Sequence, residues 1–571
     1  MKTDMLREEF KSLFEPKSVA VIGASNNVTK WGYSTLNSIL QMYKGKTYAV
    51  NHKVPEVLGL PAYDTIKDVP GPVELAVIVV PAEVVPSVMK DCVEKGVKAS
   101  VIISAGFAET GPEGKALQDE VLRIARQGGI RLVGPNCMGM WSAAVNLPAF
   151  MFPMTIMDGP LALVSQGGNI GAALVADAYS RGIGFRQYVS CGCTADIQIE
   201  DYIEYLGDDD SVKVILVYIE GLTDGNRFVE KVKQVTLKKP VIALKPGKTA
   251  AAALAISSHS GSMSGQDTVY EAAFKKAGVL RVENTLQMLD LAIALLIQPL
   301  PKGRNVAIIT PGGSYGVMCA DACALQGLNV MQLPAEIIQV FNGMFPDRWS
   351  KGNPVDPAGD RDMVQYMKAP EILLEHPEVH SLIFMGFGSF SGITSVFASG
   401  GSKWNLIDRV AGIKEFSAGA FEILASGDLE KIRGLFRDLL TLVLRIVMTT
   451  SDAELAEFIE RLVQALTTER MLKRSFYPKI TKMFKAIAAG RLKRIRMEDI
   501  GELLEPIMDA LFERWLAQYG KPVITTTFTE KTATVSEGGH FPYPNSQQAA
   551  LVLAKMIEYR EYLEGAGDDQ Q

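Results

Sequence analysis

Short apolar runs alternate with amphipathic stretches of helical period through the first part of the chain. Five of these runs are expected strands: Val19–Ile22, Tyr48–Val50, Leu75–Val80, Ser100–Ile103 and Leu132–Val133. Such alternation is typical of a parallel sheet with helices on both faces, because each parallel connection needs a crossover. We therefore expect an α/β fold that begins with a doubly wound sheet over residues 1–145.

The chain has 571 residues, more than one hydrophobic core normally holds, and the alternation resumes twice. The second block and the third open with related sequences, LALVSQGGNIGAALVADAYSRGI from Leu161 and VAIITPGGSYGVMCADACALQGL from Val306. Each contains a strand, a Gly-Gly turn, a further glycine three residues on and a helix with an Ala-Asp-Ala triplet. We infer a duplicated parallel-sheet domain, with the first copy over residues 146–300 and the second from residue 301.

Both Gly-Gly turns are candidate phosphate sites. They contain Ser165, Gly167 and Gly168 in one copy and Gly312 and Gly313 in the other. Glycines let the chain reverse sharply and expose backbone N–H groups at a helix N-terminus, where the helix dipole favours an anion. Tight packing of strand on helix would also explain a single turn. Two matching copies favour one phosphate held by two helix ends.

The pattern changes after about residue 400. Residues 404–518 have a 3.6-residue period and almost no strand signal, and strand character returns at Lys521–Thr525. We expect a helical insertion at 404–518 within a third domain formed by residues 301–403 and 519–571, with a disordered tail at 565–571. The stretch Arg470–Arg496 holds ten Lys or Arg and no acidic residue. Such a run can dock a membrane, nucleic acid or an acidic partner, but a solvated helix face is the default interpretation.

Composition excludes several classes of protein. The net charge of −6 gives no global attraction for nucleic acid or anionic lipid, and no apolar run is long enough to span a membrane. The six cysteines form no CxxC pair, so we expect reduced thiols and no metal site. His376 and His380 have the spacing of a metal pair but lack a third ligand nearby. Residues 1–14 predict an amphipathic helix and not a signal peptide, and we expect a cytoplasmic protein.

The first two expected strands end in candidate nucleotide-binding residues. Strand one leads into Gly23-Ala-Ser25, which lacks the GxGxxG of an NAD site. Strand two ends in Asn51-His52-Lys53, where an NAD-binding fold places an acidic residue for the ribose diol. A lysine there suits a phosphate-bearing ribose better. A solvated lysine with no ligand is an equally good interpretation of this position alone.

His259 and Glu220 are the candidates for chemistry. Of five histidines, His259 alone lies in a run of Ser and Gly, which leaves an imidazole accessible as a nucleophile. Glu220 lies just beyond the strand Val214–Tyr218, at the edge where open α/β sheets bind ligands. A carboxylate there can accept a hydrogen bond from one ring nitrogen and leave the other free to attack. A helix N-cap neighbour is an equally good interpretation of Glu220.

The order of the motifs resembles the NDP-forming acyl-CoA synthetases, which include ADP-forming acetyl-CoA synthetase and are related to succinyl-CoA synthetase. The motifs are GAS (Gly23–Ser25), VNxK (Val50–Lys53), IVVPA (Ile78–Ala82), SAGFAE (Ser104–Glu109), GPNCMG (Gly134–Gly139), SQGGNIG (Ser165–Gly171), SSHSGSMSG (Ser257–Gly265) and NPVD (Asn353–Asp356). The resemblance covers residues 14–400 and resumes at 520–563.

The resemblance implies a Rossmann-like CoA-binding domain followed by two flavodoxin-like domains. It implies that His259 carries phosphate between an acyl phosphate and ADP, that Glu220 orients the imidazole, and that the two Gly-Gly turns bind the phosphoryl group. The residues that it implies for CoA are Gly23, Ser25, Lys53, Pro81 and Asn136. The expected reaction interconverts acyl-CoA, ADP and phosphate with an organic acid, CoA and ATP.

The sequence departs from the family pattern in three respects. Nothing in it resembles the ATP-grasp domain, so we expect a separate ATP-grasp subunit to bind ADP or ATP with Mg²⁺ in a hetero-oligomer, or a homo-oligomer of this chain. The helical insertion is foreign to the pattern, and the expected VNPK reads Val-Asn-His-Lys. The alternative is a CoA-binding regulatory or scaffold protein without turnover, which the intact sequence around His259 disfavours.

Overall fold

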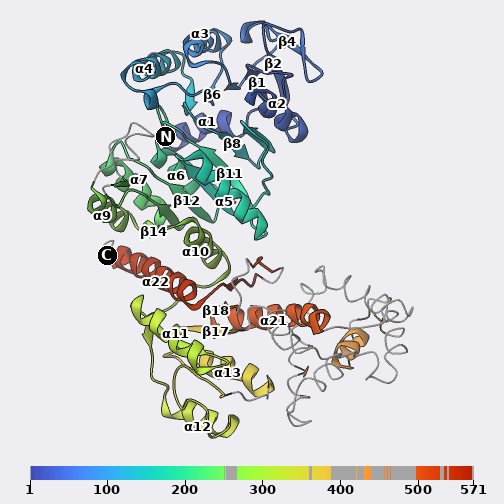
Figure 1. The fold of residues 1–571 in the computed structure, drawn as a ribbon, viewed down its shortest axis with the longest axis vertical. Helices are drawn as coiled ribbons and strands as arrows, with labels where there is room; N and C mark the ends of the chain where they lie inside the picture. Colours follow the sequence, from blue (N-terminus) through green and yellow to red (C-terminus); the bar gives the residue numbers. More distant parts are fainter. Residues whose placement is uncertain are drawn as a thin grey trace. The chain divides into compact units, whose positions relative to one another are not determined.

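The computed structural model describes residues 2–249, 251–252, 266–358, 363–386, 497–527, 533–536 and 539–568, with scattered positions between 420 and 463 (Figure 1). The chain forms two compact units. One contains Met1–Ala292 with Tyr562–Gln571, and the other contains Ile293–Glu561. Three mostly parallel sheets form their cores, which confirms the α/β class. Among the described helices, none combines the length and apolar character needed to cross a membrane.

The first sheet contains all five strands expected from the sequence. Its order is β3-β4-β2-β1-β5-β6-β7, with parallel pairing except between β3 and β4. The strands are β1 (Ser18–Ile22), β2 (Lys46–Val50), β3 (Glu56–Val57), β4 (Leu60–Tyr63), β5 (Leu75–Ile78), β6 (Ala99–Ile102) and β7 (Arg131–Val133). The helices beside them are α1 (Lys2–Phe14), α2 (Trp31–Met42), α3 (Val85–Lys95) and α4 (Pro112–Gln127).

Helices cover both faces of this sheet. Successive residues of β1 point to opposite faces, so Ile22 joins a core with Met89 of α3 and Ile124 of α4, whereas Val21 joins a core with Leu36 of α2. The strands β1, β5 and β6 are buried at every residue, as expected for parallel strands covered on both faces. The apolar pattern of the sequence therefore located these strands.

The second sheet has the order β14-β13-β12-β10-β11-β8-β9. Its strands are β8 (Gly139–Ser142), β9 (Leu147–Phe150), β10 (Leu161–Ser165), β11 (Phe185–Ser190), β12 (Val214–Tyr218), β13 (Val241–Leu244) and β14 (Leu280–Val282). Its helices are α5 (Gly168–Ser180), α6 (Ile199–Gly207), α7 (Gly225–Thr236), α9 (Asp267–Ala277) and α10 (Thr285–Ile297). The hairpin β8–β9 was not predicted. It joins the edge of the sheet by antiparallel pairing with β11.

The third sheet combines segments far apart in the chain. Its order is β16-β15-β17-β18-β19, with parallel pairing throughout. The strands are β15 (Asn305–Ile309), β16 (Asn329–Val330), β17 (Ser381–Met385), β18 (Val523–Thr526) and β19 (Pro542–Tyr543). The helices α11 (Gly313–Leu325), α12 (Ala335–Met344), α13 (Met363–Glu375), α21 (Met497–Tyr519) and α22 (Ser546–Asp568) accompany them. The chain thus leaves this sheet after β17 and returns to the neighbouring position at β18.

Most of the expected helical insertion, including Arg470–Arg496, lies outside the described residues. Its last helix, α21, packs on the third sheet through Trp515, which is fully buried against Phe384 and Phe512 and donates a hydrogen bond to Glu371. The helix α22 continues to Asp568, so the expected disorder of the tail is wrong for residues 565–568. Ala566, near the end of α22, is buried, so packing holds the helix together beyond residue 565.

Candidate functional site

Glu220 and the first Gly-Gly turn lie at the same edge of the second sheet. Glu220 follows β12 by two residues, and Gly167 follows β10 by two residues, and these strands are parallel neighbours. The side chain of Gln166 joins the turn after β10 to the loop after β12. Its Oε1 accepts hydrogen bonds from the backbone N–H of Glu220 at 2.6 Å and of Gly221 at 3.0 Å, and its Nε2 donates to the carbonyl of Gly221 at 3.1 Å. No role for Gln166 was predicted from the sequence. The signal was an amide, which can donate and accept together, directly before the two glycines.

The turn has no space for a side chain. A Cβ at Gly167 would lie 2.7 Å from Cε1 of Tyr218 and 3.4 Å from Oε1 of Glu220. The carboxylate of Glu220 therefore lies directly against the turn. Ser165 is fully buried, and its hydroxyl donates to the carbonyl of Gly167 at 2.6 Å, so this side chain shapes the turn. The helix α5 begins at Gly168, which leaves the N–H groups of its first turn unpaired within the helix.

This edge of the second sheet combines a hydrogen-bond acceptor, the carboxylate of Glu220, with the N-terminus of α5, which favours an anion. A carboxylate accepts hydrogen bonds from an imidazole N–H, and a helix N-terminus carries about half a positive charge. Burial, together with the nearby carboxylate of Glu220, raises the pKa of Tyr218 to about 12, so its hydroxyl is neutral at neutral pH. These groups suit a histidine that carries a phosphoryl group. His259 itself lies outside the described residues, and its placement beside Glu220 remains a prediction.

The second Gly-Gly turn, between β15 and α11, has similar local geometry. Thr310 Oγ1 donates to the carbonyl of Gly312 at 2.8 Å, as Ser165 does to Gly167, and α11 begins at Gly313. A Cβ at Gly313 would lie 3.3 Å from a carboxylate oxygen of Asp356. The two related sequences therefore form related turns, each at the start of a helix.

The five residues expected to bind CoA lie past the carboxyl ends of strands of the first sheet. Gly23 follows β1 with a φ of +92°, and its N–H donates to the carbonyl of Val50 at 3.0 Å. A Cβ there would meet the carbonyl oxygen of Val79 at 2.3 Å, so only glycine fits. Pro81 directly precedes the short helix Ala82–Val84 that follows β5, and Asn136 follows β7 with a φ of +55°. This is the edge where open α/β sheets bind ligands.

Asn51 joins the loops that hold the other two candidates. Its Nδ2 donates to the carbonyl of Ala24 at 2.7 Å, and its Oδ1 accepts from the N–H of Lys53 at 2.7 Å. Ser25 Oγ accepts from the N–H of Asn27 at 3.0 Å within the same loop. Lys53 is exposed, and in the part of the chain described no carboxylate forms an ion pair with it, so it is available to an anion. The role of Asn51 was missed, although its place in VNxK was noted.

The two histidines with metal-pair spacing have other contacts. Nε2 of His376 lies 3.3 Å from Oε1 of Glu336, and Nδ1 of His380 accepts a hydrogen bond from the N–H of Asn305 at 3.3 Å. Across the described ranges, no group of three or more His, Cys, Asp or Glu side chains has a geometry for a metal ion.

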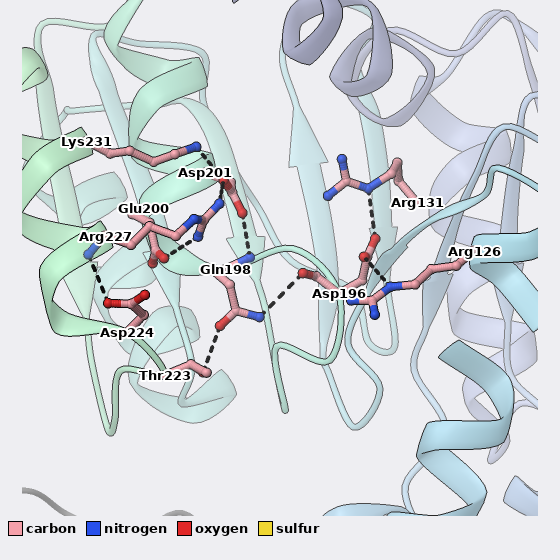
Figure 2. A pocket seen from close by; sticks show the side chains of 10 residues that line it. All are labelled: Arg126, Arg131, Asp196, Gln198, Glu200, Asp201, Thr223, Asp224, Arg227 and Lys231. Carbon is pink, nitrogen blue, oxygen red and sulfur yellow. Dashed lines mark hydrogen bonds and ion pairs between the residues drawn. The ribbon is translucent and has the colours of Figure 1, made fainter. Parts of the chain in front are cut away.

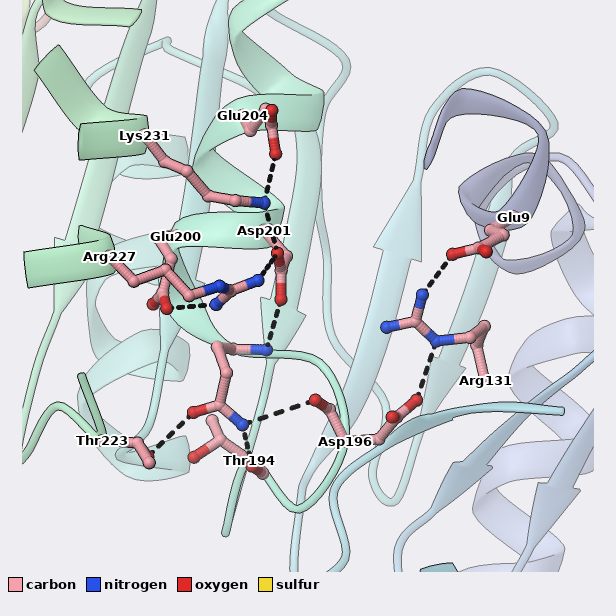
Figure 3. Close-up of polar contacts among 11 residues, drawn as sticks. Glu9, Arg131, Thr194, Asp196, Glu200, Asp201, Glu204, Thr223, Arg227 and Lys231 are labelled. Carbon is pink, nitrogen blue, oxygen red and sulfur yellow. Dashed lines mark hydrogen bonds and ion pairs between the residues drawn. The ribbon is translucent and has the colours of Figure 1, made fainter. Parts of the chain in front are cut away.

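A polar pocket of about 540 Å³ opens between the first sheet and the second (Figure 2). It is lined by Arg126, Arg131, Asp196, Gln198, Glu200, Asp201, Thr223, Asp224, Arg227 and Lys231. The cations pair with the acids around it: Arg131 lies 2.8 Å from Asp196, Lys231 lies 2.7 Å from Asp201, and Arg227 contacts both Glu200 and Asp201 (Figure 3). Since its charges are matched internally, we interpret this pocket as an ion-pair network that joins the first sheet to the second.

Gln198 connects this network to the edge with Glu220. Its Oε1 accepts from the hydroxyl of Thr223 at 2.9 Å (Figure 2), and its Nε2 donates to the carbonyl of Thr194 at 2.7 Å. The loop before Gln198 also meets the loop with Asn136, because the N–H of Cys193 donates to the carbonyl of Pro135 at 3.0 Å. Hydrogen bonds thus connect the loop expected to bind CoA to the loop that carries Glu220.

Family models match three segments of this chain. Residues 17–142 match the model of a CoA binding domain, residues 158–295 that of the succinyl-CoA ligase like flavodoxin domain, and residues 306–421 that of the ligase-CoA domain. The chain is 43% identical over 383 residues to the α subunit of ADP-forming acetate–CoA ligase II of Pyrococcus furiosus, covering 67% of this chain and 83% of that relative.

Two further relatives extend the comparison. The chain is 39% identical to the ADP-forming acetate–CoA ligase of Methanocaldococcus jannaschii. The match covers 62% of this chain and 49% of that relative, so this chain spans about half of its length. The solved structure of the dinucleotide forming acetyl-coenzyme A synthetase 1 of Candidatus Korarchaeum cryptofilum, in complex with phosphate and ADP, matches with a TM-score of 0.70 and 25% identity. That match covers 98% of this chain and 99% of the other.

Proposed function

Because the chain belongs to the family of the ADP-forming acetate–CoA ligase α subunits, we propose that it is the CoA-binding, histidine-bearing subunit of an ADP-forming acyl-CoA synthetase. The reaction interconverts acyl-CoA, ADP and phosphate with an organic acid, CoA and ATP. One observation carries the proposal: Gln166 holds Glu220 against the Gly-Gly turn at the start of α5. This arrangement provides a carboxylate for an imidazole and a helix end for a phosphoryl group.

The proposed steps follow from this chemistry. A phosphate oxygen attacks the thioester carbonyl of acyl-CoA, the C–S bond breaks, and CoA leaves as a thiol after it takes up a proton. An imidazole nitrogen of His259 then attacks the phosphorus of the acyl phosphate, and the organic acid leaves as a carboxylate. A terminal oxygen of ADP attacks the phosphohistidine, the P–N bond breaks, and ATP forms with the imidazole restored. Glu220 accepts a hydrogen bond from the other ring nitrogen and stabilises the charge on the ring.

The first sheet supplies the proposed CoA site. Lys53 is the proposed partner of the 3′-phosphate, because it is exposed beside the loop that Asn51 joins to Ala24. Gly23 and Ser25 lie in the loop after β1, where backbone N–H groups approach a pyrophosphate without hindrance. Pro81 and Asn136 complete the same edge, and the loop that holds Asn136 meets a loop of the second sheet through the hydrogen bond from Cys193 to Pro135.

The remaining features of the proposal concern partners. The name of the Pyrococcus furiosus relative as an α subunit supports a second subunit, and we assign to it an ATP-grasp fold that binds ADP or ATP with Mg²⁺. The assembly would be a cytoplasmic hetero-oligomer. Within this chain the proposed domains are residues 1–145, 146–300 and 301–403 with 519–571, interrupted by residues 404–518.

The test is phosphorylation of the protein. With an ATP-grasp partner, Mg²⁺ and ATP labelled on its γ-phosphate, we expect the chain to take up phosphate that is labile in acid and stable in base, as a phosphoramidate is. The variant His259→Ala should take up none. Label that persists in His259→Ala would contradict the role of this histidine. CoA binding without label or turnover in the wild type would favour a regulatory protein.

A further inference from the structure

Lys245 is a buried cation at the carboxyl edge of the second sheet. It follows β13 directly and is only 3% exposed. Its Nζ donates a hydrogen bond to the carbonyl of Pro246 at 2.6 Å and lies 4.5 Å from the centre of the Tyr270 ring. An ammonium can donate three hydrogen bonds, and across the described residues no carboxylate forms an ion pair with this one. Burying a cation without a carboxylate in contact is costly, so its retention requires an explanation.

The surroundings fix Lys245 at this edge. Arg281 donates to the backbone carbonyl of Lys245 at 3.3 Å, and the charge of Arg281 is matched by ion pairs with Asp267 and Glu271. The ring beneath the ammonium is also fixed, because the hydroxyl of Tyr270 accepts a hydrogen bond from the N–H of Leu222 at 3.2 Å. The cation is therefore attached to the same loop that carries Glu220.

Three neighbouring strands bring the charged groups into one row. Lys245 follows β13, Glu220 follows β12 and the turn at Gly167 follows β10, and the sheet order places these strands side by side. Neighbouring strands lie about 4.8 Å apart, so the row extends over about 10 Å. Burial lowers the pKa of Lys245, and Arg281 lowers it further, whereas Asp267 and Glu220 oppose this change. The carboxylate of Glu220 thus favours the charged form of Lys245.

The balance of charge along the row of Lys245, Glu220 and the turn at Gly167 gives a reason for a cation to be buried there. A phosphoryl group brings up to two negative charges to a turn that already has the carboxylate of Glu220 against it. The N-terminus of α5 offers about half a positive charge, and even with the second helix end expected at this phosphate the sum would only offset the carboxylate and leave the phosphoryl charge unmatched. We propose that Lys245 is an electrostatic positioning residue that supplies the missing positive charge, so that the turn after β10 holds a phosphate beside Glu220. This inference rests on the proposed function and deepens it.

Inorganic phosphate is the probe for this inference. Its affinity for the whole chain is measured by calorimetry at pH 7, with CoA present to fill the phosphate subsites of the first domain. A unit charge about 10 Å away in a protein environment should change the affinity about tenfold, so Lys245→Met should weaken phosphate binding by about that factor. Lys245→Arg should restore most of it. The control is Lys248→Met, because Lys248 is exposed and ion-paired with Glu283 at 2.5 Å, and it should bind as the wild type does.

Thermal unfolding separates this role from a structural one. If the buried charge is kept for binding, Lys245→Met removes a desolvated cation and should raise the unfolding midpoint. Since the folded pKa lies below the unfolded one, the cost of the charge is full below the folded pKa and is relieved as pH rises toward the unfolded value near 10.5. The gain in midpoint should therefore shrink between pH 7 and pH 10.

Three results would overturn the inference: unchanged phosphate affinity in Lys245→Met, a lower unfolding midpoint in that variant, or no phosphate binding by the wild type. None of them depends on the phosphorylation of His259. If His259 takes up label but Lys245→Met leaves the phosphate affinity unchanged, only the inference about Lys245 is refuted. If phosphate binding depends on Lys245 but His259 takes up no label, the proposed function is refuted and the inference about Lys245 is not.

Discussion

Gln166→Ala tests whether Glu220 works because it is held in place. The change removes three hydrogen bonds that join the turn after β10 to residues 220 and 221. Each such bond contributes about 0.5–1.5 kcal/mol, and water can replace part of this at a half-buried site. At about 0.7 kcal/mol for each bond, toward the lower end of this range, the contact between the two loops loses about 2 kcal/mol of stabilisation. If phosphoryl transfer needs the fastened loop, its rate should fall about thirtyfold.

The assay is the rate of phosphohistidine formation from labelled ATP with the ATP-grasp partner. CoA affinity should stay unchanged, because the candidate CoA residues lie at the edge of another sheet. Gln127→Ala is the control. Gln127 is exposed at the end of α4 and accepts a hydrogen bond from Arg123 at 3.1 Å, so this change should affect neither quantity. Gln166→Glu keeps the acceptor for both N–H groups but directs its second oxygen at the carbonyl of Gly221, so it should recover activity only where the carboxyl is protonated.

Two results would refute this reasoning. An unchanged transfer rate in Gln166→Ala would show that Glu220 keeps its place without the amide. A parallel loss of CoA affinity would show that the change disturbs the whole first unit and not one loop. Equilibrium unfolding distinguishes these cases, since a local effect should lower global stability by no more than the same ~2 kcal/mol.

The other predictions address the proposed ligands. Glu220→Gln should slow phosphoryl transfer while CoA affinity stays nearly intact, because the amide keeps the shape but cannot offset the charge on an imidazolium; equal loss of both, by single-turnover labelling and calorimetry, would place Glu220 elsewhere. Lys53→Ala should weaken CoA more than dephospho-CoA, by about 1.5–3 kcal/mol if the contact with the 3′-phosphate is charge-assisted. Calorimetry with both ligands measures this difference, and equal weakening would move Lys53 away from that phosphate.

The strands that were predicted from the sequence are those in which a continuous run of apolar residues forms the buried strand. Apolar runs such as Leu161–Val164 and Val214–Tyr218 are buried on both faces, so composition alone marks them. The hairpin β8–β9 was missed because it contains Trp, Ser and Pro in two short strands and is defined by antiparallel pairing with β11. That pairing joins residues about 50 positions apart, which no local pattern reports.

The third sheet shows the same limit at larger scale. The apolar stretch at Lys521–Thr525 predicted a strand, and β18 is found at Val523–Thr526. Its neighbour β17 was not predicted as a strand, although it is buried throughout. The two pair in parallel across the whole region that reads as helical in the sequence. Local pattern located one strand, whereas its partner depended on contacts across the insertion.

The edge with Glu220 separates what a sequence can and cannot show about a site. The position of Glu220 follows from one rule, that ligands bind past the carboxyl ends of parallel strands, and the rule needs only the strand to be found. The charge of the edge follows from no local rule. Lys245 reads as an ordinary lysine before a Pro-Gly turn, and its burial is made by Tyr270 and Arg281, from α9 and β14. Beside the carboxylate of Glu220 a helix end of about half a charge leaves the edge negative, and in our inference the distant packing around Lys245 supplies the positive charge that a phosphate needs.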